Sequence, residues 1–430
     1  MTRRNRRQFL KTSAALAASG VFISGAEAKP ERREPIRIAI IGTAGQGEYN
    51  TNGVAHENIV TLCDVDTNRA APARKRFPKA AFYEDYRVML EKQKDIEAVV
   101  VATPDHHHAI PTVMALRMGK HVYCEKPLAH SVHEVRTIRQ EAAKAKVATQ
   151  MGTQIHAEDN YRRVVEIVQA GAIGPVRRVH VWCNRQPDPG TRERREVKPP
   201  AGLNYDLWLG PAPHRPYHRS HLHFNWRWWW DFGGGVLADM ACHFMDLPHW
   251  ALNLRHPTTV SATGRVLHKG DNTTPSLMQV EYRYPARGTA PAVHLTWYHG
   301  VPGPDLSGKV RHGDFASGVL FEGEKGSLLA DYSRRRLLPE DRFRDFTPPK
   351  PTIARSLGHH REWLHAIRTG AATTCNFDYS GALAETVLLG NVAYRGGGDQ
   401  ITYDAATGRI TGNKRAEEFL RREYRKGWTL

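Results

Sequence analysis

The chain has 430 residues, of which 40% are hydrophobic, a formal net charge of +17 at pH 7 and five cysteines. Its lysines and arginines are scattered, which is typical of a basic surface and argues against a nucleic-acid groove, and the absence of any Cys-x-x-Cys pair argues against a cysteine-based metal site. The length exceeds what one hydrophobic core usually covers, so we expect two domains, with free thiols.

The amino-terminal segment has the three regions of a secretory signal. Four arginines lie within residues 3–7, a weakly apolar run covers residues 14–23, and Ala26-Glu27-Ala28 offers small residues for cleavage. The run is too short to span a membrane. The residues from Arg6 to Lys11 resemble a twin-arginine signal, whose pathway exports folded proteins. We therefore expect residues 1–28 to direct export by the twin-arginine machinery to the periplasm or another extracytoplasmic compartment; a basic tail is the alternative.

Apolar β-rich runs alternate with helical segments from residue 36 to residue 150. Strands are expected at residues 36–41, 59–64, 98–103 and 121–124, and helices at residues 67–77, 86–91, 110–118 and 132–145. Apolar strands that alternate with helices predict a parallel, doubly wound sheet. We therefore expect an NAD(P)-binding Rossmann domain over residues 35–150.

After residue 150 the pattern changes to long strands with few helices between them. A helix is expected at residues 161–170, strands at 176–183, 258–267, 278–284, 292–298 and 318–323, and two more helices at 360–369 and 379–394. Such a pattern predicts an open, mostly antiparallel sheet. The fold class is therefore α/β, with an α+β substrate and oligomerisation domain over residues 151–395. Residues 396–430 form a polar extension for which the sequence predicts no structure.

A glycine-rich turn directly follows the first expected strand. Glycines let a backbone approach a pyrophosphate, and the next helix offers amide donors and the positive end of its dipole. Asp64 ends the second strand about twenty residues on, where an acid would bind the adenosine ribose hydroxyls and repel a 2′-phosphate. NAD is therefore expected, although Arg69 leaves NADP open. The candidate cofactor residues here are Gly42, Ala44, Gly45, Gln46, Gly47 and Asp64, with Ala44 in place of the usual middle glycine.

The apolar stretch after three consecutive glycines, residues 233–235, predicts a helix with one polar face. Asp239, His243 and Asp246 fall at i, i+4 and i+7, on one side of a helix. Carboxylates and imidazoles avoid a dry core unless they are paired or line a cavity. We therefore predict a catalytic face. A buried structural histidine and a divalent-metal site are the alternatives.

Six short signatures follow one another along the chain. After the glycine turn and Asp64 come Thr103-Pro104-Asp105, Glu125-Lys126-Pro127, Gly152-Thr153-Gln154 and the Asp-x-x-x-His of Asp239 and His243. Their order resembles the glucose-fructose oxidoreductase / inositol dehydrogenase / MocA (Gfo/Idh/MocA) family over residues 36–395. The resemblance implies that Lys126 lies beside the nicotinamide and the substrate, and that the chain forms a dimer or tetramer. The residues that it implies near the dinucleotide are Thr103, His108, Glu125, Lys126 and Gln154.

The chemistry of a secondary alcohol assigns the catalytic roles. As the alcohol becomes a carbonyl, its oxygen must lose a proton, and a neutral histidine suits that task near physiological pH. We assign His243 as the base and Lys126 as the cation that stabilises the developing oxyanion and keeps the histidine neutral. Asp239 would hold substrate hydroxyls or orient the site, and Asp246 would fix the tautomer of His243. No metal is expected, because the resemblance requires none.

Aromatic residues gather between residues 205 and 230. They are Tyr205, Trp208, Tyr217, Trp226, Trp228, Trp229 and Trp230. Flat rings beside polar donors suit a sugar, although core packing explains some of them. The candidate substrate-binding residues are Lys126, Arg227, Trp228, Asp239, His243 and Tyr298, with Arg185 and His223 as further contacts.

These expectations combine into an exported NAD(P)-dependent oxidoreductase that acts on a sugar or polyol. Little free nicotinamide is available outside the cytosol, so the cofactor would leave tightly bound and be recycled in place. One alternative, which the resemblance also implies, is an NAD-dependent glycosidase that oxidises, eliminates and reduces. A second alternative is a non-catalytic sugar-binding or sensor protein that retains NAD.

Overall fold

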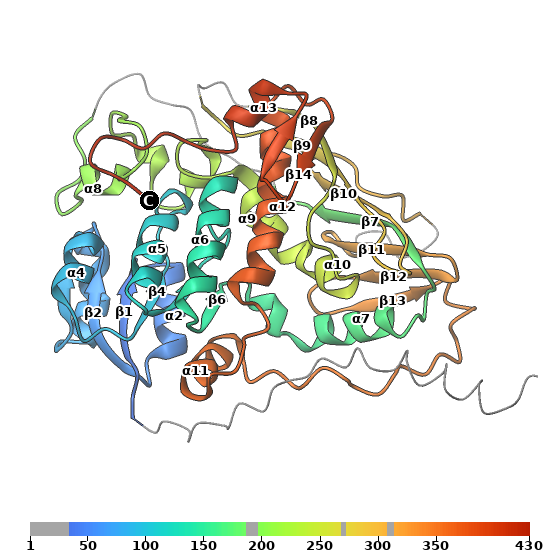
Figure 1. Cartoon of the computed structure of the whole chain (residues 1–430), viewed down its shortest axis with the longest axis horizontal. Helices are drawn as coiled ribbons and strands as arrows, with labels where there is room; N and C mark the ends of the chain where they lie inside the picture. The colour runs from blue at the N-terminus through green and yellow to red at the C-terminus, as the bar shows by residue number, and fades with distance from the viewer. Residues whose placement is uncertain (1–33, 186–196, 268–271, 308–313) are drawn as a thin grey trace, which may run out of the picture.

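The structure, a computed structural model, describes residues 34–185, 197–267, 272–307 and 314–430. The expected signal at residues 1–28 lies outside these ranges. Figure 1 shows the parallel-sheet half of the molecule beside a second half built on a larger sheet. Within the described ranges, no helix combines the length and the apolar character needed to cross a bilayer.

The amino-terminal half confirms the predicted parallel sheet, with strand order β3-β2-β1-β4-β5-β6. Its strands are β1 (Arg37–Ile41), β2 (Asn58–Cys63), β3 (Ala81–Tyr83), β4 (Ala98–Val101), β5 (His121–Cys124) and β6 (Thr149–Met151), and its helices are α2 (Gln46–Val54), α3 (Thr67–Arg76), α4 (Tyr86–Lys92), α5 (Ala109–Arg117) and α6 (Val132–Ala145). The strand order reverses between β1 and β4. Open α/β sheets bind ligands in the crevice at this switch point.

Polar side chains define where the helices of this half begin. The Asp66 carboxylate accepts hydrogen bonds from the amides of Asn68 and Arg69 at the start of α3. Ser131 and Glu134 form a reciprocal capping box on α6, which satisfies amides that the first turn leaves unpaired. The sequence did not predict β3 and β6, because a strand of three residues shows too little alternation to be recognised.

The carboxyl-terminal half confirms the predicted large, mostly antiparallel sheet, whose order is β13-β12-β11-β7-β10-β9-β8-β14-β15. Only the β7 and β10 pair is parallel among these described strands. The strands are β7 (Val176–Cys183), β8 (Thr259–Arg265), β9 (Leu277–Tyr284), β10 (Val293–His299), β11 (Gly318–Gly323), β12 (Gly326–Ala330), β13 (Arg335–Leu338), β14 (Ile401–Asp404) and β15 (Arg409–Thr411), and the helices are α7 (Asp159–Gln169), α8 (Tyr205–Leu209), α9 (Gly235–Phe244), α10 (Asp246–Ala251), α11 (His359–Thr369), α12 (Phe377–Arg395) and α13 (Lys414–Glu418).

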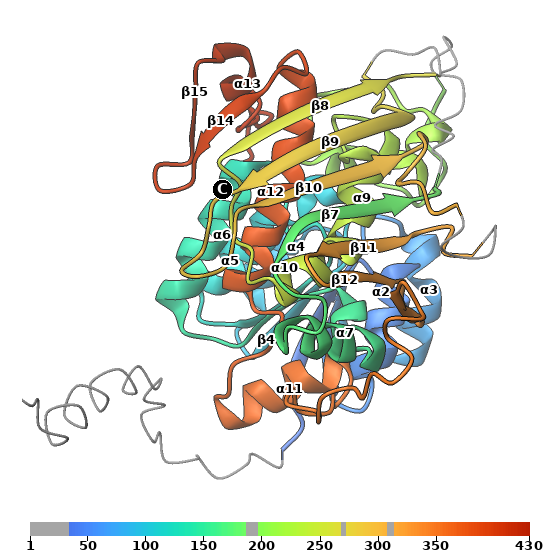
Figure 2. The same cartoon turned by 90° about the vertical axis from the view of Figure 1, so that its right-hand side faces the viewer.

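Helices α9, α10 and α12 cover one face of this sheet, as Figure 2 shows behind the strands. The alternation of β9 explains the arrangement, because Met278, Val280 and Tyr282 are buried while the residues between them are partly exposed. Apolar side chains of period two therefore pack on the helices. This packing places α9 between the large sheet and the crevice of the parallel sheet.

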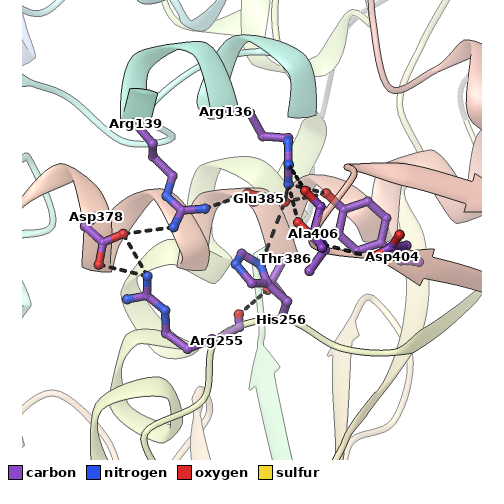
Figure 3. A network of polar contacts seen from close by, with 11 residues as sticks. Arg136, Arg139, Arg255, His256, Asp378, Glu385, Thr386, Asp404 and Ala406 are labelled. Atoms are coloured by element: carbon purple, nitrogen blue, oxygen red, sulfur yellow. Dashed lines mark hydrogen bonds and ion pairs between the residues drawn. The ribbon is translucent and has the colours of Figure 1, made fainter. Parts of the chain in front are cut away.

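A buried carboxylate joins the two halves (Figure 3). Glu385 of α12 is fully buried and accepts hydrogen bonds from Arg136 (3.0 Å) and Arg139 (3.2 Å), both of α6. Tyr403 of β14 also donates to Glu385. At the edge of the network, the exposed carboxylate of Asp378 accepts from Arg139 (2.8 Å). These contacts hold the parallel-sheet half against α12.

The residues that the sequence left as a polar extension belong to the folded body. Strands β14 and β15 extend the large sheet beyond β8. The last ten residues then return to the parallel-sheet half, where Trp428 packs beside Tyr86 (6.0 Å between ring centroids) and under the guanidinium of Arg87 (3.8 Å). The chain therefore ends near α5 in Figure 1.

Candidate active site

A cavity of about 750 Å³ lies where the two halves meet. One wall comes from the carboxyl ends of β1, β2, β4 and β5, and the other from α9 and the segments around Arg185 and Arg227. Pockets of about 300 to 1,000 Å³ are typical of small-molecule and cofactor sites. Ten of the eleven residues that the sequence proposed for cofactor binding line this cavity: Gly42, Ala44, Gly45, Gln46, Asp64, Thr103, His108, Glu125, Lys126 and Gln154.

The glycine turn between β1 and α2 is closely packed. A Cβ on Gly47, which does not itself line the cavity, would come 1.9 Å from the carbonyl oxygen of Gly42, and a Cβ on Gly42 would come 2.7 Å from that of Ala102. Gly42 and Gly45 also have positive φ angles of 83° and 61°, which favour glycine. Ala44 carries no such constraint. The backbone at the start of α2 is thus exposed to the cavity, as a dinucleotide pyrophosphate requires.

Asp64 lies at the end of β2 and holds the glycine turn in place. Its Oδ2 accepts hydrogen bonds from the amide (2.8 Å) and the hydroxyl (2.9 Å) of Thr43, and its Oδ1 accepts from the amide of Asp66 (3.0 Å). Arg69 lines the same end of the cavity. These residues, with the glycine turn, fit the adenosine end of a dinucleotide.

Glu125 collects three amide side chains beneath the turn. Its Oε1 accepts from Gln46 (3.1 Å), Asn50 (2.9 Å) and Gln154 (3.3 Å). Burial raises the pKa of this carboxyl, against the opposing charge of Lys126. Gln46 and Gln154 therefore reach the cavity as partners of Glu125, which ties the glycine turn to the end of β5.

His108 connects two of the sequence signatures. Its ring nitrogens lie 2.7 Å from the carbonyl oxygens of Pro127 and Thr103, and burial lowers its pKa to about 4. His108 therefore positions the turns that carry Thr103 and Lys126. The buried Oγ1 of Thr103 has no hydrogen-bond partner in the described part of the chain.

Lys126 and Asp239 meet across the boundary between the halves. The Lys126 Nζ donates to the main-chain carbonyl (2.7 Å) and to Oδ1 (2.8 Å) of Asp239. Arg227 Nε donates to the same Oδ1 (2.9 Å), and Arg185 Nη1 lies 3.1 Å from Oδ2. Burial would raise the pKa of Asp239, but these three cations hold it well below its usual range. Asp239 is thus an ionised anchor for three cations on the cavity wall, and its expected roles of holding substrate hydroxyls or orienting the site stay predictions.

His243 lies one turn beyond Asp239 on α9 and lines the cavity. Burial, and then the charge of Lys126, lower its pKa to about 3, so the imidazole is neutral near pH 7. Its main-chain carbonyl accepts from Tyr161 (3.1 Å). Its ring lies 6.3 Å, edge-on, from that of Tyr332. The ring position and protonation state are those that a general base requires.

Asp246 does not share the polar face predicted for α9. The helix ends at Phe244, and Asp246 begins α10. Its carboxylate instead pairs with His156 Nδ1 (2.9 Å) and accepts from the Tyr379 hydroxyl (2.7 Å). The prediction that Asp246 would fix the tautomer of His243 is therefore wrong.

Two of the proposed substrate residues do not line the cavity. Trp228 is 3% exposed and packs in the core, and Tyr298 of β10 bonds to His180 (3.0 Å). Of the aromatic cluster, Trp208 and Trp226 line the cavity, while Trp229 packs with them in a separate hydrophobic cluster. Most of these rings are core residues. Arg227, with its guanidinium 4.2 Å from the Trp226 ring, does line the cavity.

The structure adds two residues that the sequence did not single out. Asp105, from the Thr-Pro-Asp signature, is buried on the cavity wall, and burial raises its pKa to about 8 against the charges of Arg227 and Lys126. Its place in the signature was the available signal. Tyr332 lines the cavity, and its buried hydroxyl has no partner in the described part of the chain. Nothing in the sequence around Tyr332 indicated this.

Residues that can bind metals do not gather here. In the described ranges, no three His, Cys, Asp or Glu side chains are arranged to hold a metal ion. His106 and His107 both bond to the carbonyl oxygen of Trp208, at 2.9 Å. The five cysteines are buried, unpaired thiols.

Comparisons with known proteins agree with this architecture. A family model described as "Oxidoreductase family, NAD-binding Rossmann fold" (GFO_IDH_MocA) matches residues 36–153, and its "C-terminal alpha/beta domain" matches residues 176–291. Inositol 2-dehydrogenase 1 of Saccharopolyspora erythraea is 32% identical over 151 residues, which are 34% of this chain and 44% of that protein. The chain thus spans less than half the length of such curated relatives.

Solved structures extend the similarity of the fold to both halves. The WlbA dehydrogenase of Bordetella pertussis, in complex with NADH and UDP-GlcNAcA, has a TM-score of 0.63 at 16% identity, covering 86% of this chain and 99% of that chain. An inositol dehydrogenase homologue of Azotobacter vinelandii, in complex with NADH and myo-inositol, has a TM-score of 0.57 at 17% identity, covering 86% and 98%.

Proposed function

The chain belongs to the Gfo/Idh/MocA oxidoreductase family and has its NAD-binding Rossmann domain, and from this premise we propose that it oxidises a secondary alcohol of a sugar or polyol to a ketone. The observation that carries the proposal is the meeting of Lys126 with Asp239 beside His243, on a cavity that also holds the glycine turn. The cation, the candidate base and the dinucleotide site therefore line the same cavity.

The residues of this space supply the protein's part of the reaction. When bound, NAD accepts a hydride from the substrate carbon. The His243 imidazole, which is neutral near pH 7, takes the hydroxyl proton as the hydride leaves. An ammonium has three N–H donors, and Asp239 accepts two from Lys126. The third stabilises the substrate oxygen as negative charge develops on it.

We further propose that NAD is preferred over NADP, because the carboxylate of Asp64 would repel a 2′-phosphate. Arg69 is the nearest cation to offset that repulsion on this wall of the cavity. Binding titrations of both dinucleotides to the wild type and to Asp64→Ser test this. The proposal predicts tighter NAD binding for the wild type, and a preference shifted toward NADP for the variant; equal wild-type affinities would contradict it.

Export and cofactor retention complete the proposal. The signal-like segment at residues 1–28 supports export in the folded state, which lets the protein carry NAD with it. Fractionation of cells that express the full chain, with Arg6→Lys and Arg7→Lys together as the control, tests the export. Purified protein should also carry bound dinucleotide. A protein that stays in the cytoplasm, or that is purified without dinucleotide, would contradict this part.

The activity is tested by adding candidate sugars and polyols to purified protein and recording the absorbance of reduced nicotinamide. A substrate should raise this absorbance, and Lys126→Ala and His243→Ala should abolish the change. Release of an aglycone from glycosides without net reduction of the cofactor would favour the glycosidase alternative. Sugar binding with no chemistry in the wild type would favour a sensor. The dimer or tetramer is also a proposal, tested by light scattering of the purified protein.

A further inference from the structure

Arg185 and Arg227 form a pair of cations on the substrate side of the cavity. Both guanidiniums lie over the ring of Phe224, at 5.0 and 4.4 Å from its centroid, and both reach the carboxylate of Asp239. Phe224 is 47% exposed and lines the cavity beside them. Two cations held together in this way repel each other unless negative charge lies between them.

Asp239 neutralises only part of the local charge. Lys126, Arg185 and Arg227 bring three positive charges to one carboxylate, a surplus of two. The other carboxyl groups on this wall do not balance that surplus. Burial raises the pKa of Asp105 to about 8. Burial also raises the pKa of Glu125, whose Oε1 is already bonded to the amides of Gln46, Asn50 and Gln154.

The two guanidiniums also retain unused donors. Arg227 uses Nε on Asp239 and Nη1 on the Phe224 carbonyl (3.2 Å). Arg185 places Nη1 near Met240 Sδ (3.3 Å) and Asp239 Oδ2, but Oδ2 has no partner with hydrogen-bond geometry. In the described part of the chain, the Nη2 groups of both arginines have no protein acceptor. Their side chains are 35% and 18% exposed, and both line the cavity.

We propose that Arg185 and Arg227 bind an oxyanion carried by the substrate, so that the sugar or polyol is an acid, either a carboxylate such as a uronate or a phosphate ester. A planar guanidinium matches such groups with paired N–H donors. The inference rests on the proposed oxidoreductase function and specifies the class of substrate for the same site.

Matched sugars test the charge requirement. Binding of glucose, glucuronate and glucose 6-phosphate, and of galactose and galacturonate, is measured by calorimetry on the purified protein with NAD present, alongside the absorbance of reduced nicotinamide. We expect the acidic sugars to bind at least about tenfold more tightly than their neutral partners, as charge-assisted hydrogen bonds imply. The uronate and phosphate arms identify which oxyanion is taken. Equal binding of acidic and neutral sugars would overturn the inference.

Variants assign the preference to the two arginines. Arg185→Met and Arg227→Met should each lose most of the tenfold preference, while the lysine variants should retain part of it. Arg177→Met is the matched control, because Arg177 is an exposed β7 residue paired with Glu324. Circular dichroism and thermal melts establish that each variant is folded; if a methionine variant does not fold, the lysine variant carries the test. A loss of NAD affinity instead of acid preference would overturn the inference.

These outcomes separate the two proposals. If no sugar reduces the cofactor but acidic sugars bind preferentially through the arginines, the oxidoreductase assignment fails and the anion site remains. If neutral sugars are oxidised as well as acidic ones, and the arginine variants change nothing, the anion site fails and the oxidoreductase remains.

Discussion

Lys126, which follows β5 in the parallel-sheet half, donates two hydrogen bonds to Asp239 of α9, one to its main-chain carbonyl and one to its carboxylate. The pair therefore fixes both the position of the ammonium group and the placement of one half of the molecule against the other. Arg185 and Arg227 share the same carboxylate. Asp239 therefore positions three cations on the cavity wall.

Substitutions of Lys126 and Asp239 should have different effects, one mainly on catalysis and the other also on stability. Lys126→Met removes the donor for the developing oxyanion, so we expect kcat to fall about 100-fold or more with NAD affinity nearly unchanged. Asp239→Asn removes the counterion of the largely buried Lys126 and Arg227, so it should also cost roughly 3 kcal/mol of unfolding free energy. Steady-state kinetics and chemical denaturation measure the two effects. Equal stability of the two variants would show that Asp239 does not anchor the cations.

The sequence predicted the site best where local spacing determines it. Asp239 and His243 are one helical turn apart, so the prediction that they share a face holds wherever α9 is helical. The prediction for Asp246 failed because α9 ends at Phe244. Pro248, which has no N–H to donate to the Phe244 carbonyl, was the available signal for that end. The prediction that Tyr298 binds substrate also failed. Side chains alternate between the two faces of β10, and Val293, Leu295 and Trp297 occupy the buried face, so Tyr298 lies on the opposite one.

The arrangement of distant residues could not be read from local pattern. Arg185 and Arg227 lie in segments without regular periodicity, and they converge only because the large sheet and α9 bring them to Asp239. The extension after residue 396 is similar, because β14 is a strand of four residues whose pairing with β8 depends on the existing sheet edge. Tertiary contacts thus decide what short polar segments do.

Buried neutral histidines predict instability in acid. Burial lowers the pKa of His130, His243, His249 and His359 to about 3, from 6.5 in the unfolded chain. The unfolded chain therefore binds more protons, so this stability is complete above pH 6.5 and is lost as the pH falls toward 3. The raised pKa of Asp105 acts in the opposite direction, but the histidines outnumber it. The melting temperature, measured by thermal denaturation, should fall by several degrees between pH 7.5 and pH 5. A constant melting temperature would contradict the prediction.

The Glu385 network predicts a contrast between two carboxylates that share Arg139. Glu385 is fully buried, so Glu385→Gln leaves Arg136 without a counterion and leaves Arg139 with only the exposed Asp378, and it should cost about 3 kcal/mol. Asp378 has a side chain that is 70% exposed, so Asp378→Asn should cost under about 1 kcal/mol. Urea denaturation of both variants measures the difference. Similar losses would contradict the prediction that burial of the carboxylate determines how much each ion pair contributes to the free energy of unfolding.

The last ten residues predict a link between the carboxyl terminus and the cofactor site. Arg422 bonds to the buried Glu134 (2.7 Å), and Trp428 packs edge-on against His107 (5.7 Å between ring centroids), which lines the cavity with Tyr86. A chain that ends at Leu420 would leave Glu134 without this cation and His107 without this packing. We expect a lower melting temperature and weaker NAD binding, and Trp428→Ala should give both effects to a smaller extent, because Trp428 is itself buried. Dinucleotide titration of the truncated chain, Trp428→Ala and wild type measures both. Unchanged NAD affinity in Trp428→Ala would show that the tail stabilises the fold without shaping the cavity.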